Sequence, residues 1–212
     1  MPENLTLYHY WRSSCSWRVR WALALKGVPY TSVPVNILTE EHRSPAYLAK
    51  NPAGFLPSLE IDGRPYGESL ALIEWIDETW PEPPLKPEDP LARLHVRQLA
   101  LTIVAGTQPL QNPAVLKHVL PLDEAARKTA AQHWIKRGLG IYEALLAGGR
   151  PGRYSWADRV TLADLCLIPQ VYNALRFDVD LGPYPVVRGI YERCLKTPEC
   201  DQAAPHTQPG AS

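Results

Sequence analysis

The hydrophobic pattern changes its period once along the chain, and this change divides the sequence into two regions. In the first 80 residues, short runs of alternating apolar and polar residues, typical of strands, are interspersed with longer runs in which apolar residues recur at helical spacing. We expect strands over 5–8, 30–35 and 56–61 and a hairpin return after Asp62-Gly63. We also expect a helix that has the serines near position 13 at its N-terminus and ends at Gly27, and a second helix over 69–80. Strands and helices that alternate in this way predict an α/β domain.

From residue 91 onward the pattern is helical throughout. Apolar residues recur at helical spacing over 96–104 and 131–146, and no alternating run intervenes. Between the two regions lie five prolines, which exclude a regular element there, at positions 81, 83, 84, 87 and 90. The sequence therefore predicts an α/β domain over residues 1–80, a proline-rich linker over 81–90 and an all-helical domain over 91–212.

Two further helices are expected in the second region. Thr161 followed by Asp164 has the spacing of a capping box and predicts the start of a buried helix that runs through Val171. A last helix is expected over 185–195. The tail from Ala203 to Ser212 is expected to fray.

Composition and charge exclude several classes of protein. Lys plus Arg and Asp plus Glu each number 22, and no basic run occurs, so no nucleic-acid partner is expected. No apolar stretch reaches the length of a membrane span and no secretory signal is present, so we expect no membrane partner and a cytoplasmic location. The four cysteines form no C-x-x-C pair and indicate reduced thiols. The six histidines are never three or four residues apart, so no metal site is expected.

Candidate chemistry gathers where the first strand gives way to the first helix. Residues 12–20 read Arg-Ser-Ser-Cys-Ser-Trp-Arg-Val-Arg and bring three hydroxyls and a thiol to the predicted helix N-terminus. Unpaired N–H groups and the helix dipole favour an anion at such a position. A plain N-cap needs only one of these serines, so the surplus of polar groups favours a binding role.

Four other features have both a structural and a functional interpretation. Leu56-Pro57 precedes a strand, and a trans peptide is the commoner form for such a pair. Glu68-Ser69 opens a helix, where Ser69 fits an N-cap and Glu68 could accept from an ammonium group. The amides and prolines of 106–113 fit either a helix break or a binding role. Arg176 is a candidate anion clamp, although an isolated arginine is more often a solvated surface residue.

The order of these features resembles a cytosolic glutathione transferase over nearly the whole chain. Residues 13–20, Ser-Ser-Cys-Ser-Trp-Arg-Val-Arg, resemble the S-S-C-x-W-R-V-R signature of the zeta class, which includes the maleylacetoacetate and maleylpyruvate isomerases. Residues 108–112, 163–171 and 176–181 are similar to the same class. The resemblance implies a thioredoxin-like N-terminal domain, an all-α C-terminal domain and a homodimer.

The resemblance also implies a glutathione site and its residues. The glutathione-binding residues by position are Ser13, Ser14, Cys15, His42, Leu56, Pro57, Glu68, Ser69, Gln108 and Asn112. Leu56 would meet the cysteinyl backbone with Pro57 cis, and Glu68 stands where the zeta class usually has glutamine. Arg12 and Arg176 would hold the carboxylates of a small diacid substrate.

The implied activity is the glutathione-dependent cis–trans isomerisation of a maleyl diketo acid in the breakdown of aromatic compounds. Lowering a thiol pKa by two units takes roughly 2.7 kcal/mol, and a helix end supplies about 0.3 to 1 kcal/mol. A hydroxyl hydrogen bond to the anion adds about 1.5 to 3 kcal/mol, so one serine plus the helix end suffices. We expect Ser13 to be that donor, supported by Ser14 and Cys15 as the other catalytic residues.

Two alternatives stay open at this point. A transferase that conjugates or dehalogenates small α-halo acids could use the same thiol site. A non-catalytic glutathione-binding protein would keep the binding residues without turnover. The sequence does not separate maleylacetoacetate from maleylpyruvate, since both present a maleyl diketo acid to the same arginines.

Overall fold

The computed structural model describes residues 2–119, 123–149 and 152–211, which form two compact units. Unit 1 comprises residues 1–84 and 197–212, and unit 2 comprises residues 85–196. The sequence placed all of 91–212 in one helical domain, whereas the structure groups 197–212 with the α/β residues. The reason is that α10 (Pro198–Ala203) packs against α1 (Ser14–Leu25).

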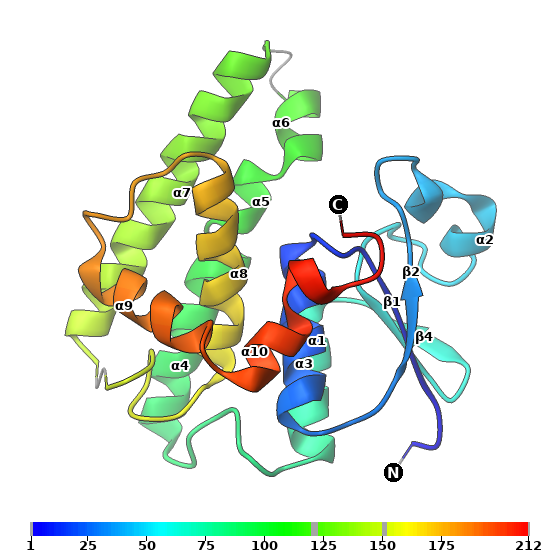
Figure 1. Cartoon of the computed structure of the whole chain (residues 1–212), viewed down its shortest axis with the longest axis horizontal. Helices are drawn as coiled ribbons and strands as arrows, with labels where there is room; N and C mark the ends of the chain where they lie inside the picture. Colours follow the sequence, from blue (N-terminus) through cyan, green and yellow to red (C-terminus); the bar gives the residue numbers. More distant parts are fainter. Residues whose placement is uncertain (1, 120–122, 150–151, 212) are drawn as a thin grey trace. The chain divides into compact units, whose positions relative to one another are not determined.

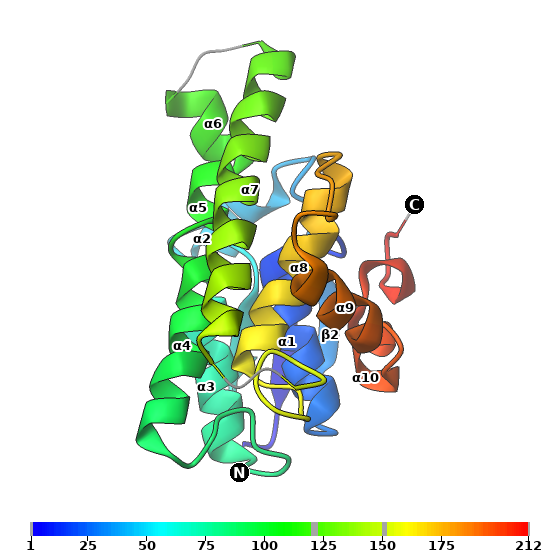
Figure 2. The same ribbon diagram turned by 90° about the vertical axis from the view of Figure 1, so that its left-hand side faces the viewer.

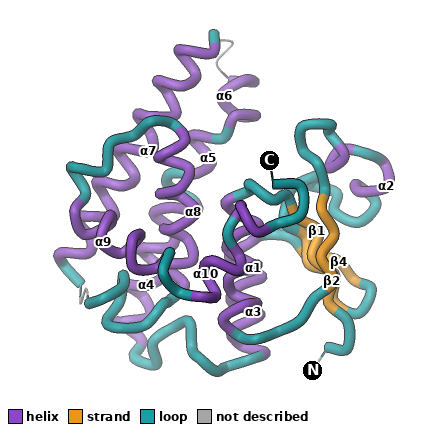
Figure 3. The backbone as a smooth tube through the Cα atoms, viewed as in Figure 1, coloured by secondary structure: helices purple, strands orange, loops and turns teal. Residues whose placement is uncertain are grey.

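A mixed four-stranded sheet forms the centre of unit 1 (Figures 1 and 3). Its order is β2-β1-β3-β4, with bounds β1 Leu5–His9, β2 Thr31–Pro34, β3 Ser58–Ile61 and β4 Arg64–Tyr66. β1 and β2 are parallel and joined through α1, whereas β3 is antiparallel to both β1 and β4. Pro29 lies just before β2 and Pro34 is its last residue, which fits the place of β2 at the sheet edge.

The Asp62-Gly63 turn between β3 and β4 forms as predicted. Asp62 has a φ of 48° and Gly63 a φ of 85°, as the two central residues of a type I′ turn require. Such a turn matches the twist of the two strands that it joins. The hairpin prediction is therefore confirmed.

α1 and α3 (Ser69–Thr79) pack side by side on one face of the sheet (Figure 1). Every residue of α1 from Ser16 to Leu23 is buried, so the helix has no polar face over two turns. Arg18 and Arg20 are part of that buried stretch. Between β2 and β3 lie the short helices η1 (Glu41–Arg43) and α2 (Pro45–Leu48).

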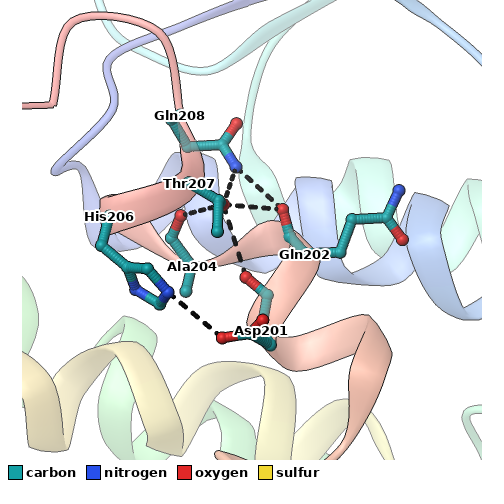
Figure 4. Close-up of polar contacts among 6 residues, drawn as sticks. All are labelled: Asp201, Gln202, Ala204, His206, Thr207 and Gln208. Carbon is teal, nitrogen blue, oxygen red and sulfur yellow. Dashed lines mark hydrogen bonds and ion pairs between the residues drawn. The ribbon is translucent and has the colours of Figure 1, made fainter.

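The C-terminal segment is ordered by its own polar contacts, whereas the sequence led us to expect fraying (Figure 4). After α10 the chain forms η2 (Pro205–Thr207). The Thr207 hydroxyl donates to the carbonyls of Gln202 and Ala204 at 2.9 and 2.8 Å. Gln208 Nε2 donates to the same Gln202 carbonyl at 2.9 Å. Ser212, which the prediction included, lies outside the described residues.

Unit 2 is helical, and no strand occurs in its described residues 85–119, 123–149 and 152–196. Its helices are α4 (Pro90–Val104), α5 (Gln108–Gln111), α6 (Pro113–Val119), α7 (Glu124–Ala147), α8 (Leu162–Arg176) and α9 (Pro185–Cys194). α8 is buried without interruption from Leu162 to Val171, and α4 and α9 pack against it (Figure 2). α8 is therefore the core of this unit.

The predicted capping box opens α8. The backbone N–H and the hydroxyl of Thr161 donate to Asp164 Oδ2 at 2.8 and 3.0 Å, and Ser155 N–H donates to Oδ1 at 2.8 Å. Burial raises the pKa of the Asp164 carboxyl, although these bonds oppose the shift. The helix continues to Arg176, beyond the Val171 end expected from the sequence.

Candidate functional site

Ser13 caps the N-terminus of α1. Its φ of −67° and ψ of 123° are extended, and its Oγ accepts the N–H of Ser16 at 3.2 Å. The cap uses a lone pair of Oγ, so the hydroxyl proton can still be donated to another group. The structural and the functional interpretation of Ser13 are therefore compatible.

Ser14 and Cys15 begin α1 and are half-buried. The guanidinium of Arg18 extends from the next turn of the helix and is fully buried. Its Nη1 lies 3.8 Å from Cys15 Sγ and 3.3 Å from Ser69 Oγ. One buried cation thus joins the start of α1 to the start of α3.

Ser69 is not the N-cap of α3, so that prediction is wrong. It is the first residue inside the helix, it is buried, and its hydroxyl accepts from Arg18. The cap position belongs to Glu68, whose side chain is exposed and makes no capping bond. Glu68 has a φ of 63°, which non-glycine residues rarely adopt and which costs roughly 1 to 3 kcal/mol. The turn at Glu68 leaves a carboxylate in solvent at a helix N-terminus.

The Leu56-Pro57 peptide is cis, which confirms the implication of the resemblance against the general preference for trans. Leu56 is half-buried, and β3 begins two residues later at Ser58. The backbone N–H and C=O of Leu56 form no hydrogen bond with any residue that the structure describes. Both groups can therefore pair with the backbone of a peptide ligand.

His42 lies in η1 and is half-buried. Its Nδ1 is buried and has no hydrogen-bond partner within the described part of the chain. Burial lowers the pKa of the imidazole, which keeps it neutral at neutral pH. A neutral ring with one unused nitrogen can donate to or accept from a ligand.

Arg12 precedes Ser13 in the same turn and is half-buried. Its guanidinium carbon lies 5.2 Å from the centre of the Trp11 ring, which is a cation–π distance. The contact uses the face of the guanidinium, and the N–H groups at its edge can still bind a carboxylate.

Three of the predicted residues lie in unit 2. Gln108 begins α5. Asn112 separates α5 from α6, and its Oδ1 accepts from Ala114 N–H at 2.9 Å, so it caps α6 and keeps its amide N–H groups for other partners. Arg176 ends α8, and its Nη1 donates to Asn173 Oδ1 at 3.3 Å.

Arg176 lines a groove of about 430 Å³ in unit 2. The other lining residues are Pro113, Leu116, Lys117, Glu124, Arg127, Lys128 and Phe177. Four cations and one carboxylate give the groove a positive balance, although Lys128 is also paired with Asp178 at 2.5 Å. Such a groove favours small anionic ligands.

Arg18 and Arg20 are both buried, although neither was expected to have a role. A usable signal was present. Each arginine adjoins the apolar Val19 in a stretch with Trp17 and Trp21, and a helix with no polar face must bury its charges with partners. The helical periodicity alone did not indicate which residues would pair with these two arginines.

The described residues contain no group of three or more potential metal ligands. Nor is any helix in 2–119, 123–149 or 152–211 long and apolar enough to cross a membrane.

The chain is similar to known proteins in sequence and in fold. Residues 7–84 match the N-terminal domain of glutathione S-transferases. The probable maleylacetoacetate isomerase 2 of Drosophila melanogaster is 43% identical over 205 residues, covering 96% of this chain and 88% of the relative.

Two solved structures match over almost the full length of the chain. A holo maleylpyruvate isomerase, described as a bacterial zeta-class glutathione S-transferase, has a TM-score of 0.94 at 41% identity, covering 98% of this chain and 100% of its own. The maleylacetoacetate isomerase of Anaeromyxobacter dehalogenans, with bound dicarboxyethyl glutathione and citrate, has a TM-score of 0.89 at 42% identity, covering 99% and 98%.

The fold and these matches define the class, which is a glutathione transferase with a thioredoxin-like N-terminal domain and an all-helical C-terminal domain. Within that class, the chain belongs to the zeta family, together with the maleylacetoacetate and maleylpyruvate isomerases. The resemblance that began from residues 13–20 is confirmed.

Proposed function

We propose that this protein is a glutathione-dependent cis–trans isomerase of a maleyl diketo acid. It converts maleylacetoacetate to fumarylacetoacetate, or maleylpyruvate to fumarylpyruvate, in the breakdown of aromatic compounds. One observation carries the proposal: full-length similarity to isomerases, one of which holds a glutathione bearing a dicarboxyethyl group in its active site. That group has the two carboxylates of the proposed substrate class.

Glutathione is the cofactor, and we propose that unit 1 binds it. The Ser13 hydroxyl donates to the thiolate, Ser14 and Cys15 support it, and Arg18 lies 3.8 Å from the Cys15 sulfur as a buried positive charge. The free backbone groups of Leu56, beside Pro57, pair with the cysteinyl residue.

The remaining glutathione contacts follow from the charge of each group. The Glu68 carboxylate accepts from the γ-glutamyl ammonium and Ser69 lies beside it. His42 contributes its unused ring nitrogen. Gln108 and the Asn112 amide belong to the helical domain, and we propose that they complete the binding of the tripeptide.

The reaction needs no net consumption of the thiol. The thiolate adds to one carbon of the cis double bond, and the displaced electron pair moves into the conjugated ketone to give an enolate. The former double bond is now single and rotates. The enolate then re-forms the double bond as trans and expels the thiolate, so glutathione returns unchanged.

Two arginines hold the substrate in this proposal. Arg12 and Arg176 each bind a carboxylate through charge-assisted and often bidentate contacts, and they help to stabilise the enolate. The positive balance of the Arg176 groove supports a dianionic substrate, because each added cation lowers the cost of binding two negative charges.

An assay with both maleyl diketo acids, with and without glutathione, tests the proposal. We expect isomerisation only when glutathione is present, with its concentration unchanged at the end of the reaction. Glutathione consumption or halide release from α-halo acids without isomerisation would instead support a conjugating or dehalogenating transferase. Binding of glutathione without either turnover would support a non-catalytic protein.

We further propose a homodimer located in the cytoplasm, with a proline-rich linker over 81–90 between the two domains. The zeta class supports the dimer, and sedimentation of the purified protein tests it. The four free cysteines support a reducing compartment.

A further inference from the structure

Arg20 is a buried cation that has no carboxylate partner among the residues described. Its side chain is 1% exposed. Its guanidinium instead donates to four neutral acceptors on two distant parts of the chain, which are the carbonyls of Ala203 (2.9 Å), Tyr10 (3.4 Å) and Trp11 (3.0 Å) and the Nδ1 of His9 (3.1 Å). A buried charge is costly unless it is fully hydrogen-bonded, so these acceptors are held tightly in place.

His9 completes the arrangement as a neutral ring. Burial and the neighbouring Arg20 lower the pKa of His9 to about 4, so the ring carries one proton at neutral pH. Because Nδ1 accepts from Arg20, the proton lies on Nε2, which donates to Ser32 Oγ at 2.7 Å. Arg20 is thereby anchored through β1 to β2.

Two of the four acceptors belong to the turn in front of α1. The Tyr10 carbonyl that accepts from Arg20 also accepts the N–H of Ser13 at 3.1 Å. The Trp11 carbonyl accepts from Arg20, and the Trp11 ring supports Arg12. Arg20 therefore holds the backbone that presents Ser13 and Arg12.

The fourth acceptor, Ala203, belongs to the C-terminal segment. Farther along this segment, Gly210 lies close to the Trp11 ring. A Cβ placed on Gly210 would be 3.7 Å from Trp11 Cδ1. The Thr207 and Gln208 bonds shown in Figure 4 fold this part of the tail back on α10. The segment thus meets the turn directly at Trp11 and indirectly through Arg20.

We propose that Arg20 and residues 198–211 form one positioning device for the turn that carries Arg12 and Ser13. The C-terminal segment thereby helps to position active-site residues, although it follows the helical domain in the chain. The inference rests on the proposed function of Arg12 in diacid binding and of Ser13 in thiol activation.

Arg20→Lys is the first test in the full-length protein. Lysine keeps the charge, but its three donors radiate from one atom and cannot reproduce the fork that reaches four acceptors. We expect the KM for the maleyl diketo acid to rise about tenfold, and the thiolate titration of bound glutathione to move up by about 1 pH unit, a roughly tenfold loss of thiolate. Ultraviolet absorbance of the thiolate measures the second effect without turnover.

Thr207→Val is the second test and leaves Arg20 intact. It removes the hydroxyl bonds that fold the tail, and we expect a smaller rise of about threefold in the KM for the diacid. Thr129→Val is the matched control, because the Thr129 hydroxyl also donates to a backbone carbonyl, that of Ala125 in α7, on an exposed surface. The control should leave both KM values unchanged.

The positioning role would be overturned if both variants, Thr207→Val and Arg20→Lys, kept the KM values and the thiolate titration of the wild type. This holds even if their unfolding temperatures are lower. Should Arg20→Lys fail to fold, Thr207→Val decides alone. Failure of the proposed function is distinguishable from this result. If the wild-type protein ionises bound glutathione but isomerises no diketo acid, the proposed function is contradicted. The thiolate titration of the variants still tests the positioning role in that case.

Discussion

Gln111 and Gln170 donate a hydrogen bond to each other inside unit 2. Nε2 of Gln111 lies 2.7 Å from Oε1 of Gln170, and the return bond measures 3.1 Å. Both side chains are buried. The pair joins α5, which begins with Gln108, to α8, which ends with Arg176. It therefore fixes two proposed ligand-binding elements relative to each other within one unit.

Gln111→Leu should destabilise the protein because it leaves the Gln170 amide unpaired in the core. We expect a loss of about 1 to 3 kcal/mol in the free energy of unfolding, measured in urea. Replacing both glutamines by leucine removes both polar groups and should recover part of the loss. A double variant that equals the sum of the single variants would contradict a coupled pair.

Gly138 and Gly140 should respond in opposite directions to alanine, although both lie in α7. A Cβ at Gly138 would overlap the Thr107 hydroxyl and lie 2.6 Å from its Cγ2, whereas a Cβ at Gly140 would meet only Tyr184 at 3.8 Å. Alanine in a helix interior gains up to about 1 kcal/mol over glycine, so Gly140→Ala should stabilise. Gly138→Ala should cost about 1 to 3 kcal/mol through overpacking. Thermal unfolding of the two variants checks the contrast, and equal shifts would refute it.

His9 should make stability depend on pH below neutrality. Its pKa is about 4 in the folded protein against about 6.5 for an ordinary histidine, so between these values the unfolded chain binds more protons. Stability is therefore fully present above pH ~6.5 and is lost as the pH falls toward 4, by up to about 3 kcal/mol.

His9→Asn isolates that contribution. Asparagine can still offer an oxygen to Arg20 but does not titrate. We expect the free energy of unfolding to fall less steeply in the variant than in the wild type between pH 6.5 and 4. Parallel curves for the two proteins would show that His9 contributes nothing to the slope.

Cys15 should be the cysteine that thiol reagents modify in the native protein. It is half-buried, whereas Cys166, Cys194 and Cys200 are fully buried, and burial raises the pKa of the Cys200 thiol to about 12. We expect one rapidly labelled thiol in the native state, four in urea, and protection by glutathione. Labelling that persists in Cys15→Ser would contradict this assignment.

Arg176→Ala should raise the KM for the maleyl diketo acid about ten- to hundredfold, since a charge-assisted bond contributes about 1.5 to 3 kcal/mol. The KM for glutathione should change little. Arg188→Ala on α9 is a suitable control, because the Arg188 side chain is 52% exposed and forms an ion pair with Glu192 on the same helix. An equal rise in the KM for the diketo acid and the KM for glutathione in Arg176→Ala would contradict the proposal that Arg176 binds the diacid.

Local rules predicted the parts of the structure that depend on neighbours in sequence. The Asp62-Gly63 hairpin, a serine cap at the start of the first helix and the Thr161–Asp164 capping box each involve residues at most a few positions apart, and all three form. The two regions separated by the prolines also appear as an α/β and a helical unit, although their bounds differ from the predicted ranges.

Contacts between distant positions lay beyond those rules. Arg20 and Ala203 are 183 residues apart, and nothing in the period of either segment indicates that they meet. Ser69 has the sequence of an N-cap, but it is the first residue of α3 and its hydroxyl accepts from Arg18, 51 positions earlier in the chain. Charged residues inside an apolar helix were the available signal, and they indicated a need for partners without identifying them.

The division of unit 1 between the two ends of the chain affects its assembly during translation. Residues 197–211 emerge from the ribosome only after the whole helical unit, and until then Arg20 lacks the Ala203 carbonyl and α1 lacks its cover from α10. Unit 1, which we propose to bind glutathione, is thus the first unit to be synthesised and the last to be completed. A nascent chain arrested before residue 197 would hold every proposed ligand-binding residue and still lack the C-terminal support for the turn that carries Arg12 and Ser13.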